Sequence, residues 1–197
     1  KSIKCLIDCP ALRNQVREGR LLTVAYQGKQ AAAVAGPTIH SVCNAGGRHK
    51  GKRKSAGREG QSSLGGDKRI HWQHTRVLAV EEASMVGCNN MADLSTAASE
   101  VYPLQKGNPF GNLIVIIIGD FNQLTPVGAK SLAHGAASDW RWQQLSTKEK
   151  YGANLFRSIN ACVMLDEANN RFSKDHAPIM DRVLSSTATE ADVRLLN

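Results

Sequence analysis

The run Leu113–Ile118 reads Leu-Ile-Val-Ile-Ile-Ile and contains no polar residue. Branched aliphatic residues without polar alternation are typical of a β-strand that is covered on both faces, as in a parallel sheet. Polar residues return at Gly119-Asp120, directly after the run. The run therefore predicts a buried parallel strand, and this restricts the folds that the chain can adopt.

The segments around this run alternate between strand and helix patterns. Leu21–Ala25 predicts a strand and Gln30–Ala35 a helix, whereas Arg76–Val80 predicts a second strand that precedes a helix from about Asn89 to Val101. Cys162–Leu165 predicts a fourth strand. The alternation indicates an α/β fold with a mostly parallel, doubly wound sheet and right-handed crossovers. In such a fold the ligand site lies at the carboxyl ends of the strands.

Length and composition limit the number of domains and the class of protein that the chain can form. A chain of 197 residues with 42% hydrophobic content can form one sizeable core, so one α/β domain is expected. No apolar run approaches the roughly 18 residues that span a bilayer, and no signal-peptide pattern is present, so we expect no membrane association. The five cysteines are an odd number without paired spacing, which indicates free thiols in a reducing, intracellular compartment. Because the chain begins at Lys1, without Met, we expect it to be a piece of a longer protein.

Positive charge is concentrated in one segment. Residues 44–76 contain nine Lys/Arg and two acidic residues, a net charge of +7 out of +8 for the whole chain. The same segment holds seven glycines, and its run Arg48–Lys54 has no apolar residue. We predict a disordered basic insert over residues 44–70. This insert either tracks the phosphate backbone of a nucleic acid or is a solvated loop whose charge only aids solubility.

Two polar clusters follow neighbouring predicted strands. Glu81-Glu82 comes after one strand, and Asp120-Phe121-Asn122-Gln123 comes after the next. Phosphate-bond chemistry needs a carboxylate to hold Mg²⁺ and another group to align the attacking water, and Glu81, Glu82 and Gln123 have suitable side chains. An ATPase of this kind also needs a glycine-rich loop that ends in Gly-Lys-Ser/Thr, and the chain begins with Lys1-Ser2. The acidic pair alone is a weak signal, because strand ends are often charged.

Taken together, motifs along most of the chain resemble those of the Pif-type DNA helicases, including the helicase region of Helitron transposons. These helicases belong to superfamily 1 and are distant relatives of RecD. The matching stretches are Lys1-Ser2 (end of motif I), Thr23–Ala32 (motif Ia), Gly36–Ser41 (Gly-x-Thr-Ile-His-Ser), Glu81–Val86 (motif II) and Gly119–Val127 (motif III). Ile-His-Ser and Gly-Asp-Phe-x-Gln-Leu are the most specific elements. The resemblance implies a RecA-like P-loop NTPase domain.

The resemblance also implies a role for each residue of the ATP site, with ATP and Mg²⁺ as cofactors. Lys1 would contact the β- and γ-phosphates, and Ser2 and Glu81 would hold Mg²⁺. Glu82 would orient and deprotonate the attacking water, and Gln123 would sense the γ-phosphate.

Motifs Ia and Ib of this family face single-stranded DNA. The resemblance therefore makes Tyr26, Gly28, Thr38 and His40 the candidate DNA contacts, through stacking and backbone hydrogen bonds. Without this context, a buried structural histidine would be the default interpretation of His40. The implied function is ATP-dependent 5′-to-3′ translocation on single-stranded DNA with unwinding of duplex DNA, in the nucleus or mitochondrion, in DNA repair, recombination and telomere maintenance.

The last part of the chain resembles the start of a connection. Arg171 stands where the family has a motif IV arginine that stabilises charge on the transferring phosphoryl group, and a surface arginine in a loop is the alternative. We therefore expect residues 1–166 to form part of the first motor domain, and residues 167–197 to begin the connection to a second one. Thr189-x-x-Asp192 predicts the N-cap of a last helix.

Some residues depart from the family pattern, and these departures lead to alternative hypotheses about the function. Glu81 stands where motif II has aspartate, and its extra methylene displaces a metal-held carboxylate by about 1.5 Å unless the backbone adjusts. The second hypothesis is therefore a catalytically inactive, basic nucleic-acid-binding remnant of a transposon helicase. A third, another P-loop ATPase without a DNA role, is opposed by Gly-Asp-Phe-x-Gln-Leu.

Two further patterns in the sequence are weaker indications of function. His71-x-x-His74 with Cys43 or Cys88 has the residue types of a zinc site, although no Cys-x-x-Cys half accompanies it. Trp140 and Trp142 are interpreted as packing against a loop or a helix face, not against a base.

Overall fold

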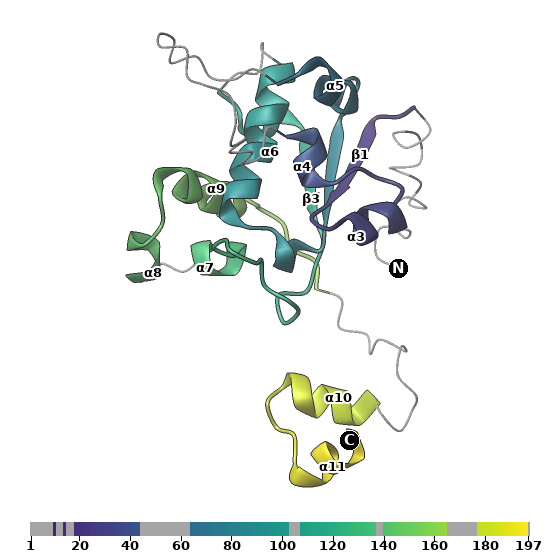
Figure 1. The fold of residues 1–197 in the computed structure, drawn as a ribbon, viewed down its shortest axis with the longest axis vertical. Coiled ribbons are helices and arrows are strands. Elements are labelled where there is room, and N and C mark those ends of the chain that lie inside the picture. The colour runs from purple at the N-terminus through teal and green to yellow at the C-terminus, as the bar shows by residue number, and fades with distance from the viewer. Residues whose placement is uncertain are drawn as a thin grey trace, which may run out of the picture. The chain divides into compact units, whose positions relative to one another are not determined.

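The computed structural model divides into two units, Lys1–Ile159 and Asn160–Asn197 (Figure 1). The residues that it describes are 10, 14, 18–43, 64–102, 107–136, 140–164 and 177–196. Lys1, Ser2, Arg171 and most of the predicted basic insert, residues 44–63, lie outside the described residues. The prediction of disorder is wrong for residues 64–70, because Leu64 is buried in the core and residues 66–69 form a helix.

A parallel sheet organises the first unit. Its strands are β1 (Leu21–Ala25), β2 (Val77–Glu81) and β3 (Ile114–Ile117), in the order β1-β2-β3. Their parallel register and the helices between them confirm the predicted α/β architecture, with each strand within one residue of its predicted bounds. The carboxyl ends of all three strands lie at one edge of the sheet.

The strands differ in how well they are covered. Four of the five residues of β1 and of β2 are buried, as expected for strands with helices on both faces. No residue of β3 is fully buried, and Ile114 is 62% exposed. The prediction that this run is covered on both faces is therefore wrong for the described residues: of the two edge strands of the described sheet, β1 is buried and β3 is left partly exposed.

The predicted fourth strand is also not found. Cys162–Met164 have no regular secondary structure and are exposed, and Leu165 lies outside the described residues. A strand is stabilised by pairing with a neighbour, and the part of the second unit that is described offers no strand to these residues.

Helices connect the strands of the first unit. Between β1 and β2 are α3 (Gly28–Ala33), α4 (Ile39–Val42), α5 (Gly66–Arg69) and the 3₁₀ turn η1 (Ile70–Trp72). Between β2 and β3 are η2 (Ala83–Met85), α6 (Cys88–Val101) and η4 (Pro109–Asn112). After β3 come α7 (Leu132–Ala136), α8 (Trp140–Gln143) and α9 (Thr147–Arg157). The helix predicted from about Asn89 to Val101 is confirmed as α6.

The core lies between the sheet and these helices. Trp72 is fully buried, and its indole N–H donates a 2.9 Å hydrogen bond to the carbonyl oxygen of Val42. Helices α6 and α9 approach closely at Gly152, where a Cβ atom would lie 1.8 Å from the carbonyl oxygen of Cys88. Only glycine fits there, so the first turn of α6 is held directly against α9.

The two late tryptophans differ in their environment. Trp142 is half-buried and lies 4.3 Å below the guanidinium of Arg157, which confirms the interpretation that it packs against a helix. Trp140 is 66% exposed, so the same interpretation is wrong for this residue. The two side chains are two positions apart on a single turn of helix and point in different directions.

The second unit contains the helices α10 (Ala177–Leu184) and α11 (Glu190–Leu196). The predicted N-cap is confirmed, because Thr189 Oγ1 accepts a 3.3 Å hydrogen bond from the amide of Asp192. The Asp192 carboxylate in turn accepts a hydrogen bond from the amide of Thr189 and two from the guanidinium of Arg182. Among the described helices of the whole chain, none has the length and apolar character needed to cross a membrane.

Candidate nucleotide and DNA-binding site

The carboxyl ends of the strands bring three of the sequence motifs together. Ala25 is the register partner of Glu81, and Thr38 forms an isolated parallel bridge with Ala25 on its other side. The row Thr38, Ala25, Glu81 therefore runs across this edge of the sheet. It places the start of motif II one strand beyond β1 from the Thr-Ile-His-Ser segment, with Ala25 between them.

The acidic pair sits at a sharp change of backbone direction. Glu82 has φ 54° and ψ 53°, which is the left-handed region that L-residues adopt at a cost of roughly 1–2 kcal/mol. The chain then turns into η2, and the amide of Ala83 donates a 3.0 Å hydrogen bond to the carbonyl oxygen of Ile118. Strained backbone of this kind is concentrated at functional sites, where the surrounding structure holds it in place.

Motif III begins at Gly119, directly after the Ile118 carbonyl that accepts this hydrogen bond. Asp120 accepts a 2.9 Å hydrogen bond from the amide of Asn122 and a longer one, 3.4 Å, from the side-chain amide of Gln123. The main-chain N–H of Gln123 also donates a 3.0 Å hydrogen bond to the main-chain carbonyl oxygen of Asp120. Asp120 thus restrains the exposed Gln123 side chain, a positioning role that was not predicted although Asp120 lies within the motif.

The far end of this loop is bonded to the same segment of chain. The amide of Cys88 donates a 2.8 Å hydrogen bond to the carbonyl oxygen of Lys130, and Gly87 forms an antiparallel bridge with Ser131. The Asn90 side chain accepts a 3.1 Å hydrogen bond from the Gly87 amide and so fixes the turn before α6. Residues 119–131, here called the motif III loop, are therefore fastened at both ends to residues 83–88.

A groove of about 350 Å³ lies beside the motif III loop. Its lining residues are Tyr26, His40, Asn89, Asn90, Asp93, Val127, Gly128, Ala129, Ser146 and Lys148. The rings of Tyr26 and His40 meet edge to face, with centroids 5.3 Å apart. His40 is exposed, so the default interpretation of a buried structural histidine is wrong. The groove thus unites two of the predicted DNA contacts with the tip of motif III.

The other two predicted DNA contacts have different surroundings. Thr38 caps α4, since its hydroxyl oxygen accepts a 3.3 Å hydrogen bond from the amide of Ser41. Gly28 begins α3 and is exposed, and it is not among the residues that line the groove. Lys148 at the groove forms a 2.6 Å ion pair with Asp93, so charges of both signs are present there. Asn89 on α6 and Lys148 on α9 were not predicted as groove residues, because only the folded arrangement of these helices brings them to the same groove as Tyr26.

The donor set at the strand ends suits magnesium better than zinc. The described residues contain no group of three or more His, Cys, Asp or Glu side chains that could hold a metal, so the zinc site with His71 and His74 is wrong for this part of the chain. Mg²⁺ keeps most of its waters and takes one or two protein carboxylates. Glu81, at the end of β2, fits that requirement.

The chain is similar to proteins of known type. A family model described as PIF1-like helicase matches residues 9–147. The ATP-dependent DNA helicase PIF1 of Candida albicans is 32% identical over 143 residues, which cover 71% of this chain and 15% of that protein. The protein of the same name from Emericella nidulans is 32% identical over 120 residues, 59% of this chain and 15% of that protein. The chain thus spans about 15% of the length of the curated relatives it matches.

Solved structures share the fold. Bacteroides Pif1 bound to single-stranded DNA superimposes with a TM-score of 0.62 at 17% identity, over 94% of this chain and 41% of that one. Pif1 helicase from Candida albicans gives a TM-score of 0.60 at 19% identity, over 98% of this chain and 38% of that one. These similarities confirm the predicted RecA-like α/β fold.

Proposed function

Because this chain belongs to the PIF1-like helicase family, we propose that it forms part of the ATP-driven motor of a DNA helicase. The motor couples ATP hydrolysis to 5′-to-3′ movement along single-stranded DNA and to the unwinding of duplex DNA. The observation that carries the proposal is the motif III loop, which is bonded at both ends to the segment after the acidic pair and lines the groove with its tip. Location in the nucleus or the mitochondrion belongs to the same proposal.

The acidic pair is assigned the hydrolytic chemistry. Mg²⁺, when bound, would neutralise charge on the β- and γ-phosphates of ATP. Glu81 would hold the metal at the end of β2, and Glu82 would accept a proton from the attacking water. The left-handed backbone of Glu82 supports this division, since it turns the second carboxylate away from the alternation of the strand. Gln123, restrained by Asp120, would contact the γ-phosphate.

Lys1, Ser2 and Arg171 complete the proposed ATP site, on the strength of the family motifs alone. Lys1 would contact the phosphates, Ser2 would share the metal with Glu81, and Arg171 would stabilise charge on the transferring phosphoryl group.

The groove is assigned to single-stranded DNA. Tyr26 and His40 present ring surfaces on which bases stack, and such stacking contributes without regard to sequence. Gly28, two residues after Tyr26, and Thr38, two residues before His40, would contact the sugar-phosphate chain, on the strength of the family motifs alone.

The coupling of the two sites follows from the shared loop. A shift of Gln123 toward the γ-phosphate would pull on residues 119–131, whose ends cannot move independently of residues 83–88. Val127, Gly128 and Ala129 at the groove would move with them. Differential contacts in two states are what allow one ligand to alter the affinity for another.

DNA-stimulated ATP hydrolysis tests the proposal. Protein that contains this chain in its full reading frame is expected to hydrolyse ATP faster when single-stranded DNA is added. Glu82→Gln is expected to lower the stimulated rate by about 10²- to 10⁴-fold, the usual contribution of a general base. Glu18→Gln is the matched control, because Glu18 pairs with Arg20 before β1, outside the candidate site. An ATP hydrolysis rate that does not change when single-stranded DNA is added would contradict the helicase assignment.

The Glu81 substitution favours a second candidate, a nucleic-acid-binding remnant without ATPase activity. Such a protein binds single-stranded DNA with the same groove but does not hydrolyse ATP. Measuring DNA binding and hydrolysis on the same preparation distinguishes the two.

A further inference from the structure

Two buried polar atoms close to the acidic pair along the fold have no hydrogen-bond partner among the described residues. Ser84 is 1% exposed, and its hydroxyl oxygen Oγ makes no hydrogen bond there. His134 is half-buried, but its imidazole Nε2 is buried and equally without a partner in this part of the chain. Buried polar groups are normally hydrogen-bonded, because an unsatisfied one retains the cost of leaving water. The arrangement described therefore carries a cost at both atoms.

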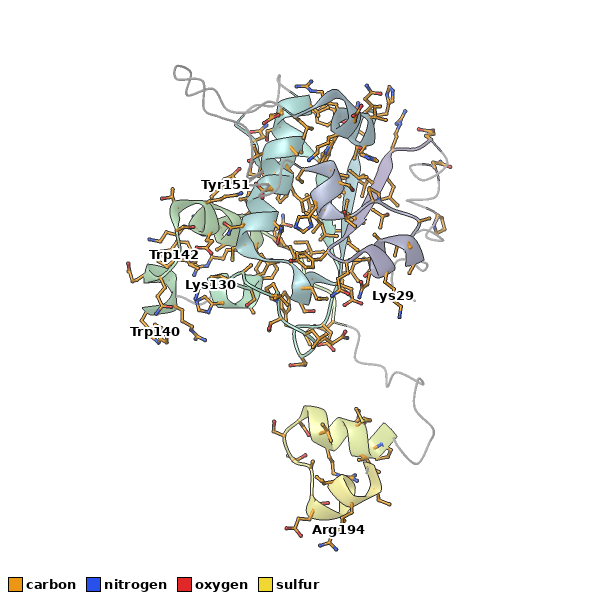
Figure 2. The ribbon with its side chains drawn as sticks, viewed as in Figure 1. Lys29, Lys130, Trp140, Trp142, Tyr151 and Arg194 are labelled. Atoms are coloured by element: carbon orange, nitrogen blue, oxygen red, sulfur yellow. The ribbon has the colours of Figure 1, made fainter. Side chains whose placement is uncertain are left out.

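The two atoms belong to elements that pack against each other. Ser84 is the middle residue of η2, and His134 lies within α7, which contacts η2. The main chain joins the same two regions, since Gly87 forms an antiparallel bridge with Ser131 directly before α7. The hydroxyl of Ser131 accepts a 3.0 Å hydrogen bond from the amide of His134 and so fixes the start of the helix. Figure 2 draws Lys130, the residue before Ser131, next to α7.

The chemistry of the two atoms is complementary. A serine hydroxyl donates one hydrogen bond, and an imidazole accepts one at Nε2 when its other nitrogen carries the proton. The third unsatisfied atom among the described residues, Oε1 of Gln30, lies on α3, which packs beside β1. Ser84 and His134 thus form a donor and an acceptor on two joined elements. A small shift between η2 and α7 would let each satisfy the other.

The place of these residues in the chain connects such a shift with ATP. Ser84 follows Glu82 by two residues, and the motif III loop, which carries Gln123, ends directly before α7. A movement of this loop toward the γ-phosphate would therefore move α7 relative to η2. We propose that Ser84 and His134 are a positioning pair, in which the Ser84 hydroxyl donates to His134 Nε2 when ATP is bound and not when the site is empty. The inference rests on the proposed function, since it deepens the coupling of the same site.

A bond that exists in only one of two arrangements favours that arrangement and the ligand that selects it. The affinity for a non-hydrolysable ATP analogue with Mg²⁺ measures this effect, in protein that contains the chain in its full reading frame. Ser84→Ala is expected to weaken binding of the analogue by roughly three- to tenfold, the net contribution of one hydrogen bond. Without nucleotide, its free energy of unfolding should be unchanged or higher, because the substitution removes an unsatisfied buried hydroxyl. A merely structural serine would not separate these two measurements.

Substitution of His134 tests the acceptor. His134→Gln places an amide near the position of Nε2 and should retain most of the affinity for the analogue. His134→Leu removes the acceptor and should lose as much affinity as Ser84→Ala. The double variant Ser84→Ala/His134→Leu should bind no more weakly than either single variant, because both residues act through one bond.

Ser95→Ala is the matched control. Ser95 is as buried as Ser84, but its hydroxyl already accepts a 3.0 Å hydrogen bond from the Phe110 amide and lies 3.0 Å from the Tyr151 hydroxyl. Its loss should lower the free energy of unfolding with and without nucleotide. The affinity for the analogue should stay the same, since Ser95 lies on α6, away from the acidic pair in the chain.

The outcomes separate the inference from the proposed function. Unchanged affinity of Ser84→Ala for the analogue would overturn the inference and leave the proposed function intact. Additive losses in the double variant would also overturn it, because the two residues would then act separately, each through a water of its own. An equal loss in His134→Gln and His134→Leu would exclude an acceptor at this position and overturn it as well. If the unaltered protein bound no ATP analogue, the proposed function would fall, and the inference with it.

Discussion

The main-chain amide of Ala83 donates a hydrogen bond of 3.0 Å to the carbonyl oxygen of Ile118. This bond joins the turn after the acidic pair to the end of the neighbouring strand. The next residue, Gly119, approaches so closely that a Cβ atom there would lie 2.5 Å from the Ala83 nitrogen. Motifs II and III are therefore in contact through their backbones, and neither can be displaced without the other.

This contact makes Gly119 sensitive to the smallest substitution. We expect Gly119→Ala to lower the free energy of unfolding by about 1–3 kcal/mol, because the atoms that the methyl group meets are the backbone and the Cβ of Ala83, which cannot swing aside. The DNA-stimulated ATPase rate should fall as well. Denaturant unfolding measures the first effect. Gly66→Ala is the control, since a Cβ atom at Gly66 would meet no atom within 4 Å. Equal unfolding curves for the two variants would contradict the close contact.

The glutamate at position 81 is expected to support catalysis. Glu81→Asp should retain DNA-stimulated hydrolysis, whereas Glu81→Gln should lose about 10²-fold or more, because it removes the charge opposite the metal. The measurement is the initial rate as a function of Mg²⁺ concentration. If only the aspartate variant hydrolyses ATP, the unaltered chain is the inactive, DNA-binding remnant.

The ring contact between Tyr26 and His40 should appear as an energetic coupling. Tyr26→Ala and His40→Ala are each expected to weaken single-stranded DNA binding. The double variant should lose less than the sum, with a coupling of about 0.5–1.5 kcal/mol for an aromatic pair. Fluorescence anisotropy titrations give the four affinities. Strictly additive losses would show that the two rings act on DNA independently of each other.

The strands and α6 were predictable because their signals are local. Leu21–Ala25 and Val77–Glu81 are apolar runs bounded by polar residues, and the sheet aligns their ends without further information. The candidate residues Glu81, Gln123, Tyr26 and His40 were found from motifs, which specify identity and order but not distance.

Features that depend on distant packing were not predictable. Whether Ile114 is covered depends on what lies beside β3, which the run of aliphatic residues cannot reveal. The same limit applies to the two late tryptophans, since the sequence does not distinguish Trp142, which packs on Arg157, from the exposed Trp140. The Asn90 bond to the Gly87 amide has no sequence signature at all, since it depends on the angle at which α6 begins.

Thiol reactivity should separate the described cysteines. Burial, with a smaller effect of Asp93, raises the pKa of Cys43 to about 12, and burial, with Glu149, raises the pKa of Cys88 to about 11. Only thiolate reacts, so at pH 8 we expect maleimide to label the exposed Cys162 and to spare Cys43 and Cys88. Peptide mass spectrometry resolves the sites.

The raised pKa values of Cys43 and Cys88 determine the direction in which the stability changes with pH. A raised folded-state pKa disfavours the thiolate in the native protein, so the stability is constant below the unfolded pKa of about 8.5 and decreases as the pH rises toward the folded values. Rapid labelling of Cys43 or Cys88 in native protein at pH 8 would contradict the packing around them.

The second unit should depend on Asp192. The hydrogen bonds from Arg182, and then the one from the Thr189 amide, hold the pKa of the Asp192 carboxyl well below its usual range. A depressed carboxyl pKa adds stability above the unfolded value of about 3.9, and this stability is lost as the pH falls from there through the folded value. Amide-exchange protection of α10 and α11 should therefore persist from neutral pH to about 4 and decline below it.

Asp192→Asn should reduce that protection at neutral pH, and the difference from the unaltered chain should shrink in acid. Glu190→Gln is the control, because its 3.5 Å pair with Arg194 is almost fully exposed and adds little. Equal protection in Asp192→Asn and Glu190→Gln, measured by exchange mass spectrometry, would show that the Arg182 contact does not hold the two helices.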